Sequence, residues 1–162
     1  MTESYLKQFS DLNVDFFENA KKSLLDPLGL YLANDVKWIK LNEKWNSSKF
    51  PVVIGGKGEP IVLFHGFDSS FLEFRRIYKL LKRNFQVIIP DLLGFGFSPR
   101  CATNEYNPSK IISYLIDLLE ALDIKNNIKM IGASMGASTA LKLSFEIPAS
   151  IEKIILLSPA GL

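Results

Sequence analysis

The residues best suited to chemistry lie in the segment Gly132-Ala133-Ser134-Met135-Gly136. A short apolar run from Ile128 to Ile131 precedes this segment, and an alanine-rich stretch with helical spacing follows it. This order predicts a strand, a sharp turn and a helix, with Ser134 in the turn between two glycines. A serine hydroxyl held out at the end of a strand can attack an electrophilic carbon. The same serine could instead be only a small residue that a tight turn requires. The residues around the motif must therefore distinguish a nucleophile from a simple turn residue.

Two further loops follow predicted strands. Residues Pro60 to Phe64 form a continuous apolar run, typical of a strand buried on both faces, and it stops at His65-Gly66-Phe67. A second apolar run, Gln86 to Ile89, leads into the glycine-rich loop at residues 91–98. Ligands bind at the carboxyl edge of an open α/β sheet. We therefore expect both loops to lie at that edge beside Ser134.

The rest of the chain alternates between strand and helix patterns. Helices are predicted at residues 71–81, at 107–122 after the capping pair Asn107-Pro108, and from Ser134 to about Ile147. Further strands are predicted at Val36 to Leu41, at Phe50 to Ile54 and at Ile151 to Leu157, with a polar connection from Asn42 to Lys49 between the first two. This alternation predicts an α/β fold, with a mostly parallel sheet and helices on both faces.

Residues 1–35 have a different character, which we interpret as an N-terminal helical arm preceding a sheet domain at residues 36–162. Phe16, Phe17, Ala20 and Leu24 fall close to helical spacing until Asp26-Pro27 interrupts the pattern. Such an arm can cover its own domain, a partner chain or a membrane surface. Because its charges are mixed rather than basic, we expect it to cover its own domain.

The composition disfavours several function classes. The chain has 162 residues with 19 basic and 17 acidic side chains, and a net charge of +2 indicates neither a nucleic-acid surface nor an acidic partner. One histidine and one cysteine disfavour a protein-built metal site, and the absence of a GxxxxGKS/T or strand-initial GxGxxG pattern predicts no nucleotide cofactor. The single Cys101, and the lack of a secretory signal or an 18-residue apolar run, predict a cytoplasmic protein without a stable membrane anchor.

The order of the motifs resembles the α/β-hydrolase family: a β-hairpin, a strand with His-Gly-Phe, a strand with Asp-x-x-Gly-x-Gly-x-Ser and a strand with Gly-x-Ser-x-Gly, separated by helices. The resemblance covers about Trp38 to Leu162. The motif at Gly132 to Gly136 is similar to that of the esterase, lipase and C–C-bond hydrolase branches, and the sequence is similar to cyanobacterial or plastid members. The resemblance implies that Ser134 is a nucleophile and that the backbone N–H groups of Phe67 and Met135 form an oxyanion hole.

The resemblance also implies supporting roles. Gly132 and Gly136 would shape the turn, and Gly66 would keep the first loop close to it. His65 is the only histidine, but the catalytic histidine of the family comes late in the chain, after the acid. His65 and Asp91 are therefore implied to order loops rather than to act as base and acid.

In this family the triad follows the order serine, acid, histidine, so the acid and the histidine would come after Leu162. The resemblance thus covers an amino-terminal half, truncated after the sixth strand, and implies that a carboxy-terminal half or another chain covers the exposed sheet. Two functions stay open. One is a cofactor-free serine hydrolase acting on a small ester, thioester, amide or similar acyl substrate, and the other is a non-catalytic binding or interaction module. Phe67, Phe71, Phe95 and Phe97 fit an acyl or aromatic substrate pocket or plain core equally well.

Overall fold

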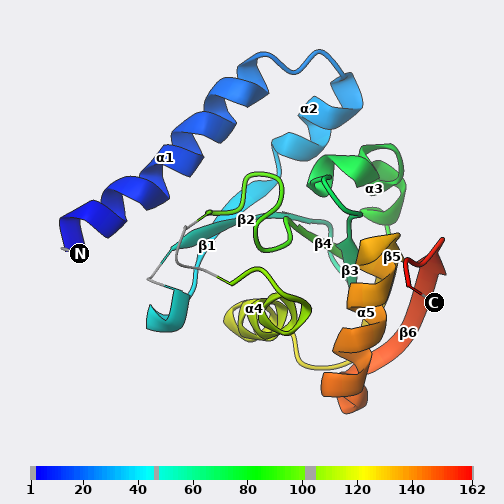
Figure 1. The fold of residues 1–162 in the computed structure, drawn as a ribbon. Coiled ribbons are helices and arrows are strands. Elements are labelled where there is room, and N and C mark those ends of the chain that lie inside the picture. Colours follow the sequence, from blue (N-terminus) through cyan, green and yellow to red (C-terminus); the bar gives the residue numbers. More distant parts are fainter. Residues whose placement is uncertain (1–2, 46–47, 101–104, 162) are drawn as a thin grey trace.

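The computed structural model describes residues 3–45, 48–100 and 105–161. Within these ranges the strands form one sheet of order β1-β2-β4-β3-β5-β6, with helices on both faces (Figure 1). The strands are β1 (Val36–Lys40), β2 (Lys49–Gly55), β3 (Pro60–Phe64), β4 (Gln86–Pro90), β5 (Ile128–Ala133) and β6 (Ile151–Leu157). The helices are α1 (Glu3–Lys22), α2 (Pro27–Ala33), α3 (Arg75–Leu81), α4 (Pro108–Ala121) and α5 (Met135–Glu146), and 3₁₀ turns occur at Glu43–Trp45, Phe71–Phe74 and Pro148–Ser150.

The sheet is mostly parallel, as predicted. Strands β4, β3, β5 and β6 run in one direction, whereas β2 pairs in antiparallel fashion with β4 on one side and with β1 on the other. Helices connect β3 to β4, β4 to β5 and β5 to β6, and each helical crossover returns the chain to the same end of the sheet. The three loops singled out in the sequence therefore all follow the carboxyl ends of parallel strands.

Both faces of the central strands are buried, which explains why their sequences are continuous apolar runs rather than alternating ones. One face packs against α4 and α5, and its strand residues include Val52, Val62, Ile88 and Met130. The other face lies under α2, α3 and the end of α1, and its strand residues include Val53, Ile61, Leu63, Val87 and Ile89.

The N-terminal arm packs on its own sheet domain. Phe17 of α1 is only 3% exposed, and its ring centroid lies 6.0 Å from those of Trp38 and of Phe71. The Asp26 side chain caps α2 by accepting a hydrogen bond from the Leu28 N–H at 2.9 Å, and it also accepts one from the Arg75 guanidinium of α3. Contacts at both helices thus hold the arm over the face that α3 covers.

Two expectations need correction. The connection from Asn42 to Lys49 is not simply polar, because Trp45 in its 3₁₀ turn is only 4% exposed and donates its indole N–H to Asp117 at 2.6 Å. The helix expected at residues 71–81 begins as a 3₁₀ turn and becomes α-helical only at Arg75.

Cys101 lies outside the described residues. In the described ranges, no helix combines the length and the apolar character needed to cross a bilayer.

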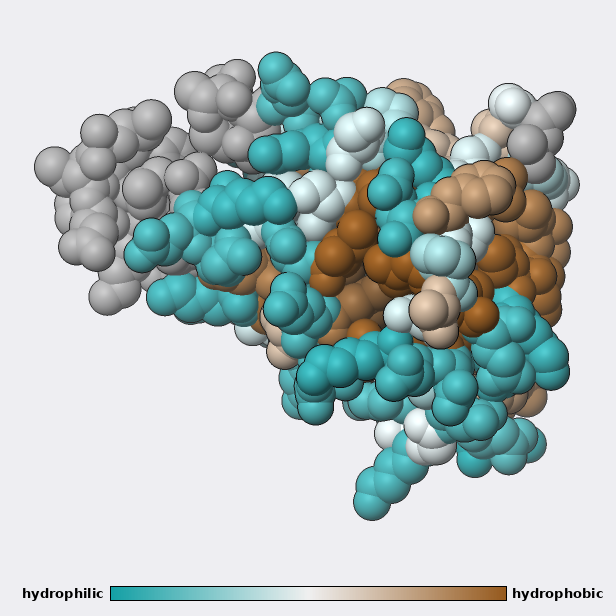
Figure 2. Space-filling model, turned by 90° about the horizontal axis from the view of Figure 1, so that it is seen from below, coloured by the Kyte–Doolittle hydropathy of each residue, from teal (hydrophilic) through white to brown (hydrophobic). Residues whose placement is uncertain are grey.

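Strand β6 forms one edge of the sheet, because among the described strands it pairs only with β5. Ile154 and Leu156 pack against the core on the α5 side. The alternating residues Ile155 and Leu157 are 53% and 46% exposed. In Figure 2, apolar residues gather in the middle of the view and along its right side, where α5 and β6 lie in Figure 1. Apolar surface is therefore open along this edge.

Candidate active site

Ser134 lies in the turn between β5 and α5 with its side chain exposed. Its φ of 52° and ψ of −118° place a non-glycine residue in a sparsely populated region, which costs about 1–3 kcal/mol. Hydrogen bonds hold the turn in place, since the Ser134 N–H donates to the Leu157 carbonyl at 2.9 Å and the Ser134 carbonyl accepts from the Ala160 N–H at 3.2 Å. The end of β6 and the loop after it thus fix the strained conformation.

The glycines on either side of Ser134 are required by close backbone approach. A Cβ atom on Gly132 would lie 2.3 Å from the Gly136 oxygen, and one on Gly136 would lie 2.0 Å from the Phe64 oxygen. Neither distance can accommodate a side chain, so the turn is pressed against the end of β3. Gly66 faces the same turn, since a Cβ atom on it would lie 3.4 Å from the Ser134 Cβ.

The His65 side chain is fully buried, and both of its ring nitrogens bind backbone groups. Nε2 accepts a hydrogen bond from the Leu92 N–H at 3.0 Å, so Nδ1 carries the proton and donates it to the Gly66 carbonyl at 2.8 Å. Burial lowers the pKa of His65 below its ordinary value, which keeps the ring neutral. The ring ties the loop after β3 to the loop after β4, and it has no nitrogen left to accept a proton from Ser134.

These contacts orient the peptide between Gly66 and Phe67. In a trans peptide the carbonyl and the N–H point in opposite directions, so holding the Gly66 carbonyl on His65 directs the Phe67 N–H the other way. The Gly66 N–H itself donates to the Glu73 carboxylate at 2.8 Å. Among the described residues, no acceptor is paired with the N–H of Phe67 or of Met135. Of the two amides implied as oxyanion donors, that of Phe67 follows Gly66, which faces Ser134, and that of Met135 follows Ser134 directly.

The Asp91 carboxylate is buried inside the glycine-rich loop. Its two oxygens accept hydrogen bonds from the N–H groups of Phe71 and Phe97, each at 2.6 Å. A Cβ atom on Gly96 would lie 2.2 Å from Asp91 Oδ2, so the loop closes around the carboxylate. Burial raises the pKa of Asp91 to about 7, although the two N–H donors partly offset this effect. Its nearest oxygen is 3.9 Å from His65 Nε2, but that nitrogen already accepts from a backbone N–H, so the carboxylate does not orient a base.

Phe95 and Phe97 have different surroundings. The Phe97 ring stacks on Phe71 at 5.6 Å between centroids and lies 5.1 Å from Phe17, between the loop and α1. The Phe95 ring instead lies 5.5 Å from that of Phe67, which is 73% exposed. Phe97 therefore belongs to the contact with the arm, and Phe95 belongs to the loops around Ser134.

Two contributors to this site could not be identified from the sequence. Glu73 gave no signal, because its hydrogen bond reaches back seven residues to Gly66 across a turn whose shape the sequence does not specify. The loop after β6 was also missed, although its Pro159-Ala160-Gly161 sequence is a turn signal. Ser138 of α5 donates its hydroxyl to the Ala160 carbonyl, which adds a second tie between this loop and α5.

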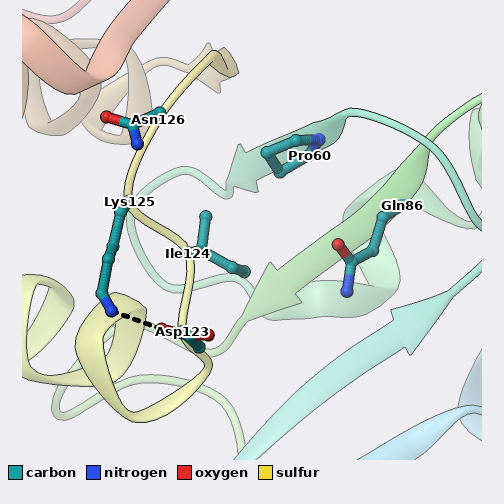
Figure 3. Close-up of a pocket in the computed structure, with 6 residues that line it drawn as sticks. All are labelled: Pro60, Gln86, Asp123, Ile124, Lys125 and Asn126. Atoms are coloured by element: carbon teal, nitrogen blue, oxygen red, sulfur yellow. Dashed lines mark ion pairs between the residues drawn. The ribbon is translucent and has the colours of Figure 1, made fainter.

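A shallow cavity of about 330 Å³ lies at the amino-terminal ends of the parallel strands, away from the three loops (Figure 3). It is lined by Pro60, Gln86, Asp123, Ile124, Lys125 and Asn126, of which Asp123 and Lys125 form an ion pair at 2.6 Å. Pro60 and Gln86 begin β3 and β4, whereas Ser134 follows the end of β5. This cavity is therefore separate from the candidate site.

Comparison with known proteins shows the family. Residues 59–161, which include all three loops and β3 to β6, match the alpha/beta hydrolase fold family. The chain belongs to this family. It is similar to 2-hydroxymuconate semialdehyde hydrolase of Pseudomonas sp. (strain CF600), with 31% identity over 109 residues that make up 65% of this chain and 38% of that protein. It is also similar to lipase 1 of Psychrobacter immobilis, with 35% identity over 104 residues, or 64% of this chain and 32% of the lipase.

Among solved structures, this family member resembles a meta-cleavage product hydrolase from Pseudomonas fluorescens IP01. The TM-score is 0.70 and the sequence identity 24%, and the match covers 77% of this chain and 45% of that one. At this identity the likeness concerns the fold alone. The chain thus spans less than half the length of each of these three proteins.

Proposed function

We propose that this α/β-hydrolase family member takes part in hydrolysis with Ser134 as the nucleophile, on a small substrate with an ester, thioester, amide or similar acyl bond. The observation that carries the proposal is the exposed, strained Ser134 placed against a loop whose Phe67 N–H has no partner among the described residues. The similarity to a semialdehyde hydrolase and a lipase supports it. A purely binding role is less favoured, because the turn and both donors are kept.

The chemistry follows from the positions of these groups. Attack of Ser134 Oγ on an acyl carbon forms a new C–O bond and moves the carbonyl electron pair onto its oxygen. The N–H groups of Phe67 and Met135 would stabilise this oxyanion, and losing one such donor typically costs about 3 kcal/mol. The start of α5 adds positive potential at the same point. A base takes the Oγ proton and passes it to the leaving group, whose expulsion leaves an acyl-serine, and water then hydrolyses this to the free acid and the Ser134 hydroxyl.

The proposal needs a general base other than His65. His65 is the only histidine of the 162 residues, and backbone groups occupy both of its nitrogens. Removing the triad histidine from a serine hydrolase lowers turnover on the order of a million-fold. We therefore expect the 162-residue chain alone to react slowly, with the base and the acid supplied by residues outside it.

The test is reaction of the 162-residue chain with a fluorescent fluorophosphonate, followed by peptide mapping. We expect slow labelling at Ser134, at least about tenfold faster than at any other serine, because the proposed oxyanion donors lie beside Ser134. Ser134→Ala should abolish this labelling, and Ser109→Ala, at an exposed position at the start of α4, should not change it. Labelling spread evenly over several serines would rule out the proposed role of Ser134.

A further inference from the structure

A row of three aromatic rings connects the two loops beside Ser134. The ring centroids of His65 and Phe95 lie 6.1 Å apart at an interplanar angle of 73°, and those of Phe95 and Phe67 lie 5.5 Å apart at 69°. Both contacts have the edge-to-face geometry that aromatic pairs prefer. The row begins at the buried His65 ring and ends at Phe67, which is 73% exposed.

The exposed end of this row lies at the candidate site. Phe67 follows Gly66, and a Cβ atom on Gly66 would be 3.4 Å from the Ser134 Cβ. The Phe67 backbone N–H is also one of the two proposed oxyanion donors. A substrate whose carbonyl oxygen binds this N–H therefore places its neighbouring substituent within reach of the Phe67 ring.

The chemistry of the row favours one kind of substituent. Its accessible surface is the apolar ring of Phe67, backed by Phe95, which is itself only partly buried. Of the charged groups nearby in sequence, Glu73 binds the Gly66 N–H, and Asp68, directly after Phe67, is an exposed carboxylate that disfavours an anionic substituent. A planar aryl group can extend the edge-to-face row by one more ring.

We propose that Phe67 and Phe95 form a subsite that binds an aryl group on the acyl or leaving side of the substrate. The subsite rests on the proposed function, because the position of the substrate is set by attack of Ser134 and by the Phe67 N–H. Phe97 lies outside the subsite, because its ring packs against Phe71 and Phe17. The aromatic loops thus divide into a ligand-binding part and a part that supports the arm.

Ring binding can be measured without turnover. The ¹⁵N-labelled 162-residue chain is titrated with phenylacetamide and with its saturated analogue cyclohexylacetamide, each up to about 10 mM. We expect phenylacetamide to shift the amide resonances of residues 66–68 and 94–96, and to bind roughly threefold more tightly than the analogue. Phe67→Ala should weaken phenylacetamide binding by roughly three- to tenfold and remove the preference for the aryl ring.

Two further variants make the test specific. Phe95→Leu keeps an apolar side chain of similar size, so it should preserve the fold and lose the preference for the aryl ring. Phe145→Ala removes a phenyl group that is 74% exposed on α5, about 16 Å along the helix from Ser134, and it should leave binding unchanged.

Equal affinity in Phe67→Ala and the unaltered chain would overturn the subsite, as would shifts centred on α5 and β6 or no saturable shift at all. If Ser134 still reacts with the fluorophosphonate in that case, only the subsite is lost. If the aryl ring binds as expected and Ser134 does not react, the nucleophile role is lost and the binding site is kept.

Discussion

Gly66 faces Ser134 across two loops that are 68 positions apart in the sequence, since a Cβ atom on Gly66 would lie 3.4 Å from that of Ser134. This close approach is possible because Gly136 lets the first turn of α5 approach the end of β3. It brings the Phe67 N–H and the exposed hydroxyl of Ser134 into one site. The integrity of this site can be tested at each of the groups that hold it.

Gly136→Ala should destabilise the fold. The added Cβ would lie 2.0 Å from the Phe64 carbonyl oxygen, a backbone atom that cannot move without disturbing β3. We expect a loss of about 1–3 kcal/mol in the free energy of unfolding, measured by urea denaturation. Gly29→Ala is a matched control in α2, because its Cβ would lie 3.2 Å from the flexible end of Leu24 and at an ordinary 3.6 Å from the Asp26 Cβ. Equal effects of the two substitutions would contradict the close approach.

Glu73→Ala should loosen the loop that carries Phe67. It removes the acceptor of the Gly66 N–H, and a hydrogen bond to a charged group contributes about 1.5–3 kcal/mol. We expect lower stability together with slower fluorophosphonate labelling of Ser134. Glu73→Gln keeps a carbonyl oxygen at the same place and should restore most of both properties. If the glutamine variant behaved like the alanine variant, the negative charge rather than the hydrogen bond would be the important feature.

Asp91 should make stability depend on pH. Burial raises its pKa from 3.8 to about 7, so between about pH 4 and pH 7 the folded chain binds a proton that the unfolded chain has released. The contribution of Asp91 to the free energy of unfolding therefore falls as the pH rises through this window. The measurement is the difference in urea stability between the unaltered chain and Asp91→Asn, taken from about pH 4.5 to 7.5. A difference that stays constant with pH would mean that Asp91 keeps an ordinary or lowered pKa.

The open edge at β6 should promote self-association. Unpaired strand edges with exposed apolar side chains pair readily with other chains. Ile155→Lys places a charge on a side chain that is 53% exposed, so we expect little loss of stability and less association in sedimentation velocity. Ile154→Lys, one residue earlier, points into the core on the α5 side and should cost about 2 kcal/mol or more. If the Ile155 variant associated as strongly as the unaltered chain, self-association would have to occur through another surface.

Several features could be predicted from local sequence because their causes are local. The apolar runs from Pro60 to Phe64 and from Gln86 to Ile89 indicated buried parallel strands, and helices between them require a parallel sheet. Gly132-x-Ser134-x-Gly136 indicated the strand, turn and helix that the structure contains. The family resemblance, drawn from the order of these motifs, is confirmed by the match over residues 59–161.

Other features depended on contacts between distant segments. Trp45 was assigned to a polar connection because its neighbours are polar. In the structure the Trp45 ring packs in the core, and its indole N–H donates a hydrogen bond to Asp117 of α4. Phe95 and Phe97 could not be separated by their spacing. Their roles differ only because α1 lies over Phe97 and Phe67 lies beside Phe95.

The sequence by itself determined the strand and helix pattern, the family and the residue most suited to nucleophilic attack, since periodicity and glycine spacing are properties of short segments. Only the tertiary structure decided that both nitrogens of His65 are occupied by backbone groups, that Glu73 holds the Gly66 N–H and that Gly66 faces Ser134. Each of these relationships joins loops that meet only when the parallel strands are aligned at one edge of the sheet, so no local pattern could encode them.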